Sequence, residues 1–130
     1  MTPEVKGRLH VRRRIASFGY AFEGWWHVLR TQPNAWIHAA ISLVVFVLAF
    51  WLDLSPIEWA ILILTTMAVW IAEFINTSLE AVVDLTMPEI HPLAKAAKDV
   101  AAAAVLVGAI GAVVIGLLIL GPPLWQRLFG

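Results

Sequence analysis

Apolar residues dominate three long stretches of the chain, which are separated by short polar segments. Residues 35–52 contain no charged side chain, and as a helix they would extend about 27 Å, close to the thickness of the hydrocarbon core of a bilayer. The other two stretches cover residues 57–83 and about 93–120. Because backbone groups in lipid must be hydrogen-bonded within the protein, this pattern predicts three transmembrane helices.

Turn signals mark the ends of these stretches. Residues 53–56, Asp-Leu-Ser-Pro, predict a tight turn with proline in the first turn of the next helix. Pro92 is likewise suited to the first turn of the third helix. The Gly-Pro-Pro sequence at residues 121–123 predicts the end of that helix.

A different pattern precedes the first apolar stretch, at about residues 5–30. Apolar residues recur there at spacings of three and four, as on one face of a helix: Val11, Ile15, Phe18, Phe22, Trp25 and Leu29. Arginines begin the segment and tryptophans lie near its end, which favours an amphipathic helix in the headgroup plane of the membrane. The alternative is a soluble helix that packs on a cytoplasmic partner.

Composition and charge exclude several classes of protein. Of the 130 residues, 61% are hydrophobic and 14% are charged, which is too apolar for a soluble domain of this size. We therefore expect an all-α integral membrane protein, with residues 1–130 as a single domain. The net charge of zero gives no indication of a nucleic-acid partner, and the lack of cysteine excludes disulfides. The basic N-terminus lacks the features of a removable signal peptide.

Lysine and arginine are distributed unevenly among the polar segments. The N-terminal segment is basic, and residues 84–99 contain Lys95 and Lys98. In contrast, the turn at residues 53–56 has no positive residue, and the C-terminal end has only Arg127. By the positive-inside rule, the N-terminus and the 84–99 segment are expected in the cytoplasm and the C-terminus outside.

The second apolar stretch carries polar residues on one face near its cytoplasmic end. Glu73, Asn76, Glu80 and Asp84 follow an uncharged run, residues 59–72, and at about 100° per residue they fall within an arc of about 80°. If Ile57 lies at the outer boundary of the hydrocarbon core, Glu73 is about 24 Å and Glu80 about 35 Å further along the helix. Since this core is about 30 Å thick, Glu73 lies just inside its cytoplasmic boundary and Glu80 just outside it. A carboxylate at this depth costs free energy unless it is paired, protonated or hydrated, which favours a functional role.

Other interpretations of this polar face stay open at the level of sequence. The acids could pair with basic residues to hold helices together, or they could line an ion or proton pathway in a non-enzymatic oligomer. A continuous pathway needs polar residues toward the outer leaflet, where residues 59–72 offer only Thr65 and Thr66. His38, in the first apolar stretch, could hydrogen-bond another helix.

The start of the third helix carries charged residues at the same level of the membrane. Lys98 and Asp99 lie where this helix enters the bilayer, level with Glu80. Acidic groups that hold a divalent cation, together with a lysine that binds phosphate, indicate a nucleotide-phosphate site. The chain has no glycine-rich phosphate-binding loop, so such a site is not built on a soluble kinase fold.

Small residues form a second stripe, along the third helix, at spacings of three and four: Ala94, Ala97, Ala101, Ala104, Gly108 and Gly111. Such a stripe lets two helix backbones approach closely. General alanine richness of an apolar helix would also produce it.

Two segments together resemble the signature of the prokaryotic diacylglycerol kinase and undecaprenol kinase family: Glu73-Phe-Ile-Asn76-Thr77-Ser-Leu-Glu80-Ala-Val-Val-Asp84 and His91-Pro-Leu-Ala-Lys-Ala-Ala-Lys98-Asp99. The resemblance covers nearly the whole chain. It implies a small homotrimeric enzyme of the bacterial cytoplasmic (inner) membrane, which uses MgATP to phosphorylate the hydroxyl of a lipid alcohol. Because three helices cannot enclose a lipid and ATP alone, we expect sites between protomers.

The resemblance also implies roles for individual residues. Glu73 would be the catalytic base that faces the lipid hydroxyl, and Asn76 would orient groups beside it. Glu80 would bind the metal and the nucleotide. Further positions match nucleotide-site residues in relatives: Arg13, Tyr20, Glu89, His91, Lys98 and Asp99. Arg13 would also contact the lipid substrate.

The chain departs from the family pattern at several positions. Gln32 stands at a metal-binding position where relatives often have glutamate, and its neutral amide oxygen is a weaker magnesium ligand. Trp36 stands where an arginine is common, and Ala16 where a lysine is frequent. Ala102, at a substrate-binding position, replaces a serine of the enteric diacylglycerol kinases. Together with the His-Pro-Leu-Ala-Lys segment and the Gln-Pro-Asn before Ile37-His38, it favours undecaprenol over diacylglycerol as the substrate.

Overall fold

The computed structural model describes the backbone of residues 3–87, 89 and 91–130, and the side chains of residues 14, 16–87, 89 and 91–130. Within this range the chain forms helices and no strand: α1 (Pro3–Thr31), α2 (Pro33–Trp51), α3 (Pro56–Thr86) and α4 (Pro92–Phe129). The last three are long and apolar enough to cross a membrane, which confirms the all-α membrane fold. Helix α1 belongs to one compact unit, Met1–Pro33, and the other helices belong to a second, Asn34–Gly130.

Helix α1 presents aromatic side chains to its surroundings. Phe18, Phe22 and Trp25, from the predicted apolar face, are all exposed. Near the C-terminal end of the helix, the Arg30 guanidinium lies 5.1 Å from the ring centroid of Trp26, a cation–π contact. The structure thus confirms a helix over this segment, and its amphipathic position in the headgroup plane stays a prediction.

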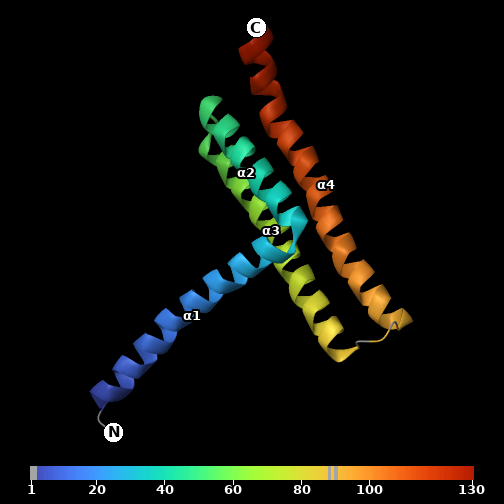
Figure 1. Cartoon of the computed structure of the whole chain (residues 1–130). Helices are drawn as coiled ribbons and strands as arrows, with labels where there is room; N and C mark the ends of the chain where they lie inside the picture. The colour runs from blue at the N-terminus through green and yellow to red at the C-terminus, as the bar shows by residue number, and fades with distance from the viewer. Residues whose placement is uncertain (1–2, 88, 90) are drawn as a thin grey trace. The chain divides into compact units, whose positions relative to one another are not determined.

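In the second unit, α3 lies alongside both α2 and α4 (Figure 1). The turn between α2 and α3 is tight because Asp53 adopts a left-handed conformation, with φ at 54°, which aspartate tolerates better than most residues. Ser55 then caps α3 in a capping box with Glu58, each side chain bonding the other's backbone N–H, and Pro56 occupies the first turn. The turn predicted from the sequence is thus present.

Few apolar side chains of this unit are buried within the chain. A small cluster of Ala49, Leu52, Leu62 and Leu120 joins the three helices near the α2–α3 turn. Large side chains elsewhere face outward, such as Phe50 at 78% and Leu117 at 68% exposure. In water this surface would be strongly unfavourable, whereas in lipid it is the expected exterior.

Helix α4 differs from the prediction at its C-terminal end. The Gly-Pro-Pro sequence was expected to stop the helix, but α4 continues through Pro122 and Pro123 to Phe129. Each proline removes one backbone N–H donor, yet the fixed φ of the proline ring is itself helical. The helix therefore loses two hydrogen bonds without having to end.

The small-residue stripe of α4 is partly accounted for by packing within the chain. A Cβ atom at Gly108 would lie 3.9 Å from the Cγ2 atom of Val69 on α3, whereas one at Gly111 would meet none of the described residues within 4 Å. Gly108 thus serves the close contact between α3 and α4.

Candidate active site

The polar face predicted on α3 is present and largely buried. Glu73 is 1% exposed, and Asn76 and Thr77 are each 6% exposed. The Asn76 side-chain amide donates a hydrogen bond to Glu80 Oε1 at 3.2 Å, and the Thr77 hydroxyl donates to the backbone carbonyl of Glu73. Since residues three and four apart are neighbours on a helix, these contacts confirm that Glu73, Asn76 and Glu80 share one face.

Helix α2 contributes a partner for Glu73. The Nε2 atom of His38 lies 3.7 Å from Glu73 Oε2, an ion pair when the imidazole is protonated. The rings of His38 and Trp70 meet edge to face with centroids 6.4 Å apart. The Trp70 indole N–H in turn donates to the Ser42 hydroxyl at 3.4 Å. A carboxylate inside the bilayer is thus given a polar partner, as its desolvation requires.

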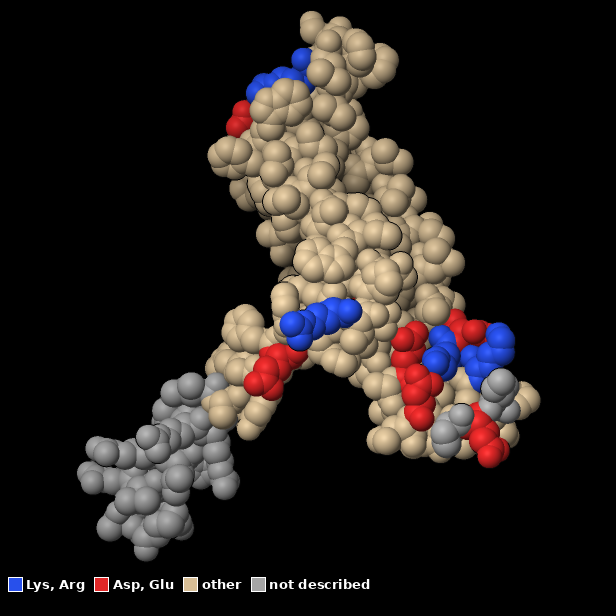
Figure 2. Space-filling model, viewed as in Figure 1, with Lys and Arg blue, Asp and Glu red and all other residues tan. Residues whose placement is uncertain are grey.

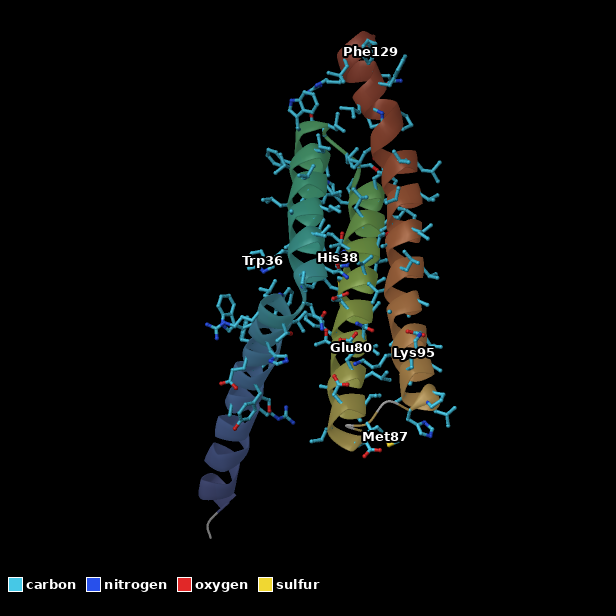
Figure 3. All side chains as sticks on the ribbon, turned by 45° about the vertical axis from the view of Figure 1, so that its right-hand side comes forward. Trp36, His38, Glu80, Met87, Lys95 and Phe129 are labelled. Atoms are coloured by element: carbon cyan, nitrogen blue, oxygen red, sulfur yellow. The ribbon has the colours of Figure 1, made fainter. Side chains whose placement is uncertain are left out.

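Charged side chains gather at the end of the hairpin where α3 and α4 are joined, and the surface of the helices beyond this end is uncharged over most of its length (Figure 2). Lys98 Nζ on α4 donates to Asp84 Oδ1 on α3 at 2.9 Å. Lys95 pairs with Asp99 on the same helix. These four residues line a pocket of about 340 Å³ together with Glu89 and His91. In Figure 3, Glu80 and Lys95 lie toward this end of α3 and α4, near Met87.

The electrostatic field of Lys98 reaches the acidic face of α3. Its positive charge interacts with Glu80 as well as with Asp84, and Glu80 interacts with Glu73. The expectation that Lys98 stands level with Glu80 is therefore consistent with the structure. Asp99, in contrast, is turned toward Lys95.

His91 caps the N-terminus of α4. Its Nδ1 atom accepts a hydrogen bond from the backbone N–H of Leu93 at 3.2 Å. Capping fixes the start of α4 and thereby the direction of Lys95 and Lys98. Glu89 is exposed at the rim of the same pocket.

The other predicted site residues lie elsewhere in the chain. The side chain of Arg13 lies outside the described residues. Tyr20 is exposed and Gln32 is half-buried in the unit that contains α1. Ala102 is exposed on α4 and lines neither the charged pocket nor the apolar pocket described next. The roles of these residues stay predictions.

An apolar pocket of about 480 Å³ lies between α2, α3 and α4. Its α3 wall runs from Leu62 to Val69, and α4 contributes residues from Ala109 to Leu124. The polar side chains at its α2 wall are His38 and Ser42. Along α3, the apolar pocket, the acidic face and the charged pocket therefore follow one another in sequence.

Known proteins resemble this chain over most of its length. Residues 19–120 match the model of the family described as prokaryotic diacylglycerol kinase. The chain belongs to this family. An undecaprenol kinase of Bacillus subtilis is 44% identical over 117 residues, which cover 90% of this chain and 95% of that protein. A diacylglycerol kinase of Synechocystis is 47% identical over 85% of this chain and 63% of that protein. The diacylglycerol kinase of Escherichia coli K12 is 39% identical over 78% of this chain and 84% of that protein.

Membership of this family makes the chain a membrane lipid kinase, and a kinase uses ATP. For such a kinase, magnesium is the expected metal. The buried Asn76 Oδ1 atom has no hydrogen-bond partner among the described residues, and it lies on the side chain that bonds Glu80. A carboxylate beside a free amide oxygen fits Mg²⁺, which takes oxygen ligands and usually only one or two from protein carboxylates. No group of three acidic or histidine side chains among the described residues forms a complete metal site.

Two features of this lipid kinase site escaped sequence reasoning. The partner of Asp84, at the end of the polar face, was not named from the sequence, and the structure identifies it as Lys98. His38 was expected to bond some other helix, and the structure identifies its partner as Glu73. The signal for His38 was a lone polar side chain in an apolar stretch, which indicates a partner without naming it.

Proposed function

We propose that this lipid kinase transfers the γ-phosphoryl group of MgATP to the hydroxyl of undecaprenol, with diacylglycerol as the second choice of substrate. One observation carries the proposal: α3 holds the acidic face between an apolar pocket and a charged pocket. The apolar pocket suits a hydrocarbon chain, and the charged pocket suits phosphates. The similarity to an undecaprenol kinase over 90% of the chain, with the sequence features around Ala102, supports undecaprenol.

In the proposed reaction Glu73 is the general base. Its carboxylate accepts the proton of the lipid hydroxyl as the hydroxyl oxygen bonds the γ-phosphorus of ATP. The bond from that phosphorus to the β–γ bridging oxygen breaks, and ADP leaves with the electron pair. Asn76 orients Glu80, and Lys98 offsets the negative charge of the phosphates. Arg13, Tyr20, Glu89, His91 and Asp99 are assigned to the nucleotide site by the resemblance.

Magnesium would be held by Glu80, with the Asn76 amide oxygen near it and Gln32 at the second metal-binding position. The ion supplies charge neutralisation and alignment of the phosphate oxygens. Since Gln32 is neutral, we expect this kinase to hold one metal less firmly than relatives with glutamate there.

We assign the protein to the bacterial cytoplasmic membrane, with the charged pocket and the N-terminus on the cytoplasmic side. The charged end of the α3–α4 hairpin supports this orientation, because ATP is cytoplasmic and lysine favours that side. The working form is proposed to be a homotrimer whose sites are completed between protomers.

A competition assay tests the substrate. Purified protein receives MgATP and equal mole fractions of undecaprenol and diacylglycerol in micelles, and labelled lipid products are separated. We expect undecaprenyl phosphate to dominate. The control is Glu73→Gln, a change of nearly equal volume that should retain assembly on size-exclusion chromatography and form neither product. Preference for diacylglycerol would overturn the choice of lipid, and full turnover by Glu73→Gln would remove Glu73 from the role of base.

An ion or proton pathway has less support. The Thr65 hydroxyl on the outer half of α3 donates to the Ile61 carbonyl of its own helix, and the adjacent pocket is apolar. A pathway would need polar groups facing one another along this half of the membrane.

A further inference from the structure

We propose that His38 is a positioning residue, which holds the Glu73 carboxylate in the orientation needed for phosphoryl transfer. The inference rests on the proposed role of Glu73. His38 lies on the side of α2 that faces α3, whereas Trp36, two residues earlier, points away from it (Figure 3). No position on α2 was assigned to the catalytic machinery from the sequence.

The first argument is the isolation of Glu73. Its side chain is 2% exposed, that of His38 is 14% exposed, and the atoms that face each other are 3.7 Å apart. Among the described residues, the charges that act on Glu73 are those of His38 and Glu80, and Glu80 is of like sign. Lys98 on α4 acts on Asp84 and Glu80 instead. His38 is therefore the side chain that can stabilise a negative Glu73.

The second argument is that the His38 ring is itself held in place. Trp70 of α3 contacts this ring edge to face, with ring centroids 6.4 Å apart. The buried Nε2 atom of His38 has no hydrogen-bond partner among the described residues. A buried polar atom without a partner is uncommon and indicates a functional site.

The third argument is the place of His38 between pocket and base. The imidazole lines the apolar pocket, whereas Glu73 does not. Since Oε2 of Glu73 faces the imidazole, the orientation of this carboxylate toward a lipid that enters from the pocket depends on His38. A base must be within hydrogen-bond reach of the proton it takes, so loss of the imidazole would let the carboxylate turn away.

The test compares three variants in the lipid kinase assay at saturating lipid and MgATP. His38→Ala should lower kcat about 10- to 100-fold, the range typical of residues that orient a ligand or reactive group, with little change in KM for MgATP. His38→Gln keeps a donor near the position of Nε2 but cannot become charged, so it should recover part of kcat. Ser42→Ala is the matched comparison, since it removes another polar contact between α2 and α3 but leaves the imidazole in place, so its loss of kcat should be clearly smaller than that of His38→Ala.

Rescue by the conservative variant separates positioning from packing. His38→Gln should regain part of kcat with KM for MgATP unchanged, because its side-chain amide can still reach toward the Glu73 carboxylate. A purely structural role predicts equal losses in Ser42→Ala and no recovery in His38→Gln, and either result would overturn the proposal. So would wild-type kcat in His38→Ala. If His38→Ala fails to assemble, His38→Gln decides. Absence of turnover in the wild-type protein would instead contradict the lipid kinase assignment itself.

Discussion

At the scale of single residues, Glu80 connects the two halves of the site. It accepts a hydrogen bond from Asn76, and it interacts with both Glu73 and Lys98. It thus stands between the buried Glu73 and the charged pocket. A carboxylate so placed is suited to hold a magnesium ion, which would neutralise phosphate charge and needs only one or two carboxylates from the protein.

Glu80→Gln should weaken the use of magnesium. The neutral amide loses most of the attraction for the cation, so the Mg²⁺ concentration for half-maximal activity at fixed ATP should rise about tenfold or more, equivalent to about 1.4 kcal/mol. Titration of activity with MgCl₂ measures this. Glu58→Gln is the control, since it makes the same change at the other end of α3, where glutamine also serves a capping box. An unchanged titration in Glu80→Gln would count against the metal role.

At the scale of helices, the contact between α3 and α4 holds the acidic face against Lys98. The helices approach closely at Gly108 and Val69, and the Asp84–Lys98 pair lies further along the same interface. Packing between membrane helices depends on such small residues, because lipid supplies no hydrophobic drive for association. A larger side chain at position 108 should therefore separate α3 from α4 and disturb the site further along the same interface.

The pair Gly108→Ala and Gly108→Leu tests this contact. A single added carbon would lie at an ordinary contact distance of 3.9 Å from Val69, so alanine should be tolerated. The branched side chain of leucine would have to push α3 and α4 apart, with an expected loss of about 1–3 kcal/mol. Thermal unfolding of the detergent-solubilised proteins measures the difference. Equal midpoints for the two variants would show that the helices do not depend on close approach here.

At the scale of the whole molecule, the described part of a single chain does not form a complete site. Among the described residues, acidic and histidine side chains form no complete metal site, and Glu73, the proposed base, is nearly inaccessible at 1% exposure. A Cβ atom added at Gly111, in the small-residue stripe, would meet no described residue within 4 Å. These features are expected if neighbouring copies supply the missing walls and ligands.

The purified protein should therefore be a trimer. Light scattering that subtracts the detergent should give the mass of three copies of the 14.3 kDa chain, and phosphoryl transfer should follow the trimer peak. Dilution to the point of dissociation should abolish turnover with the same midpoint as the loss of trimer. A fully active monomer would contradict the proposal.

Much of this architecture follows from local patterns. Hydropathy and the helical period were sufficient for three spans, for the helix before them and for the shared face of Glu73, Asn76 and Glu80, because each depends on residues close together in the chain. The end of α4 was wrongly placed because proline's own φ is compatible with a helix. A proline therefore marks a possible end, and packing decides whether it is used.

Contacts between helices could not be obtained in this way. Helix periodicity says which face Glu73 occupies, but not that His38 of α2 lies 3.7 Å away, since residues far apart in the chain meet only through the rotation and offset of packed helices. The same holds for Asp84 with Lys98, and for the two pockets at either end of the acidic face. The sequence of one helix, α3, thus determines the chemical character of the site. The partners of its acidic side chains and the access of lipid to them are determined by how three helices pack.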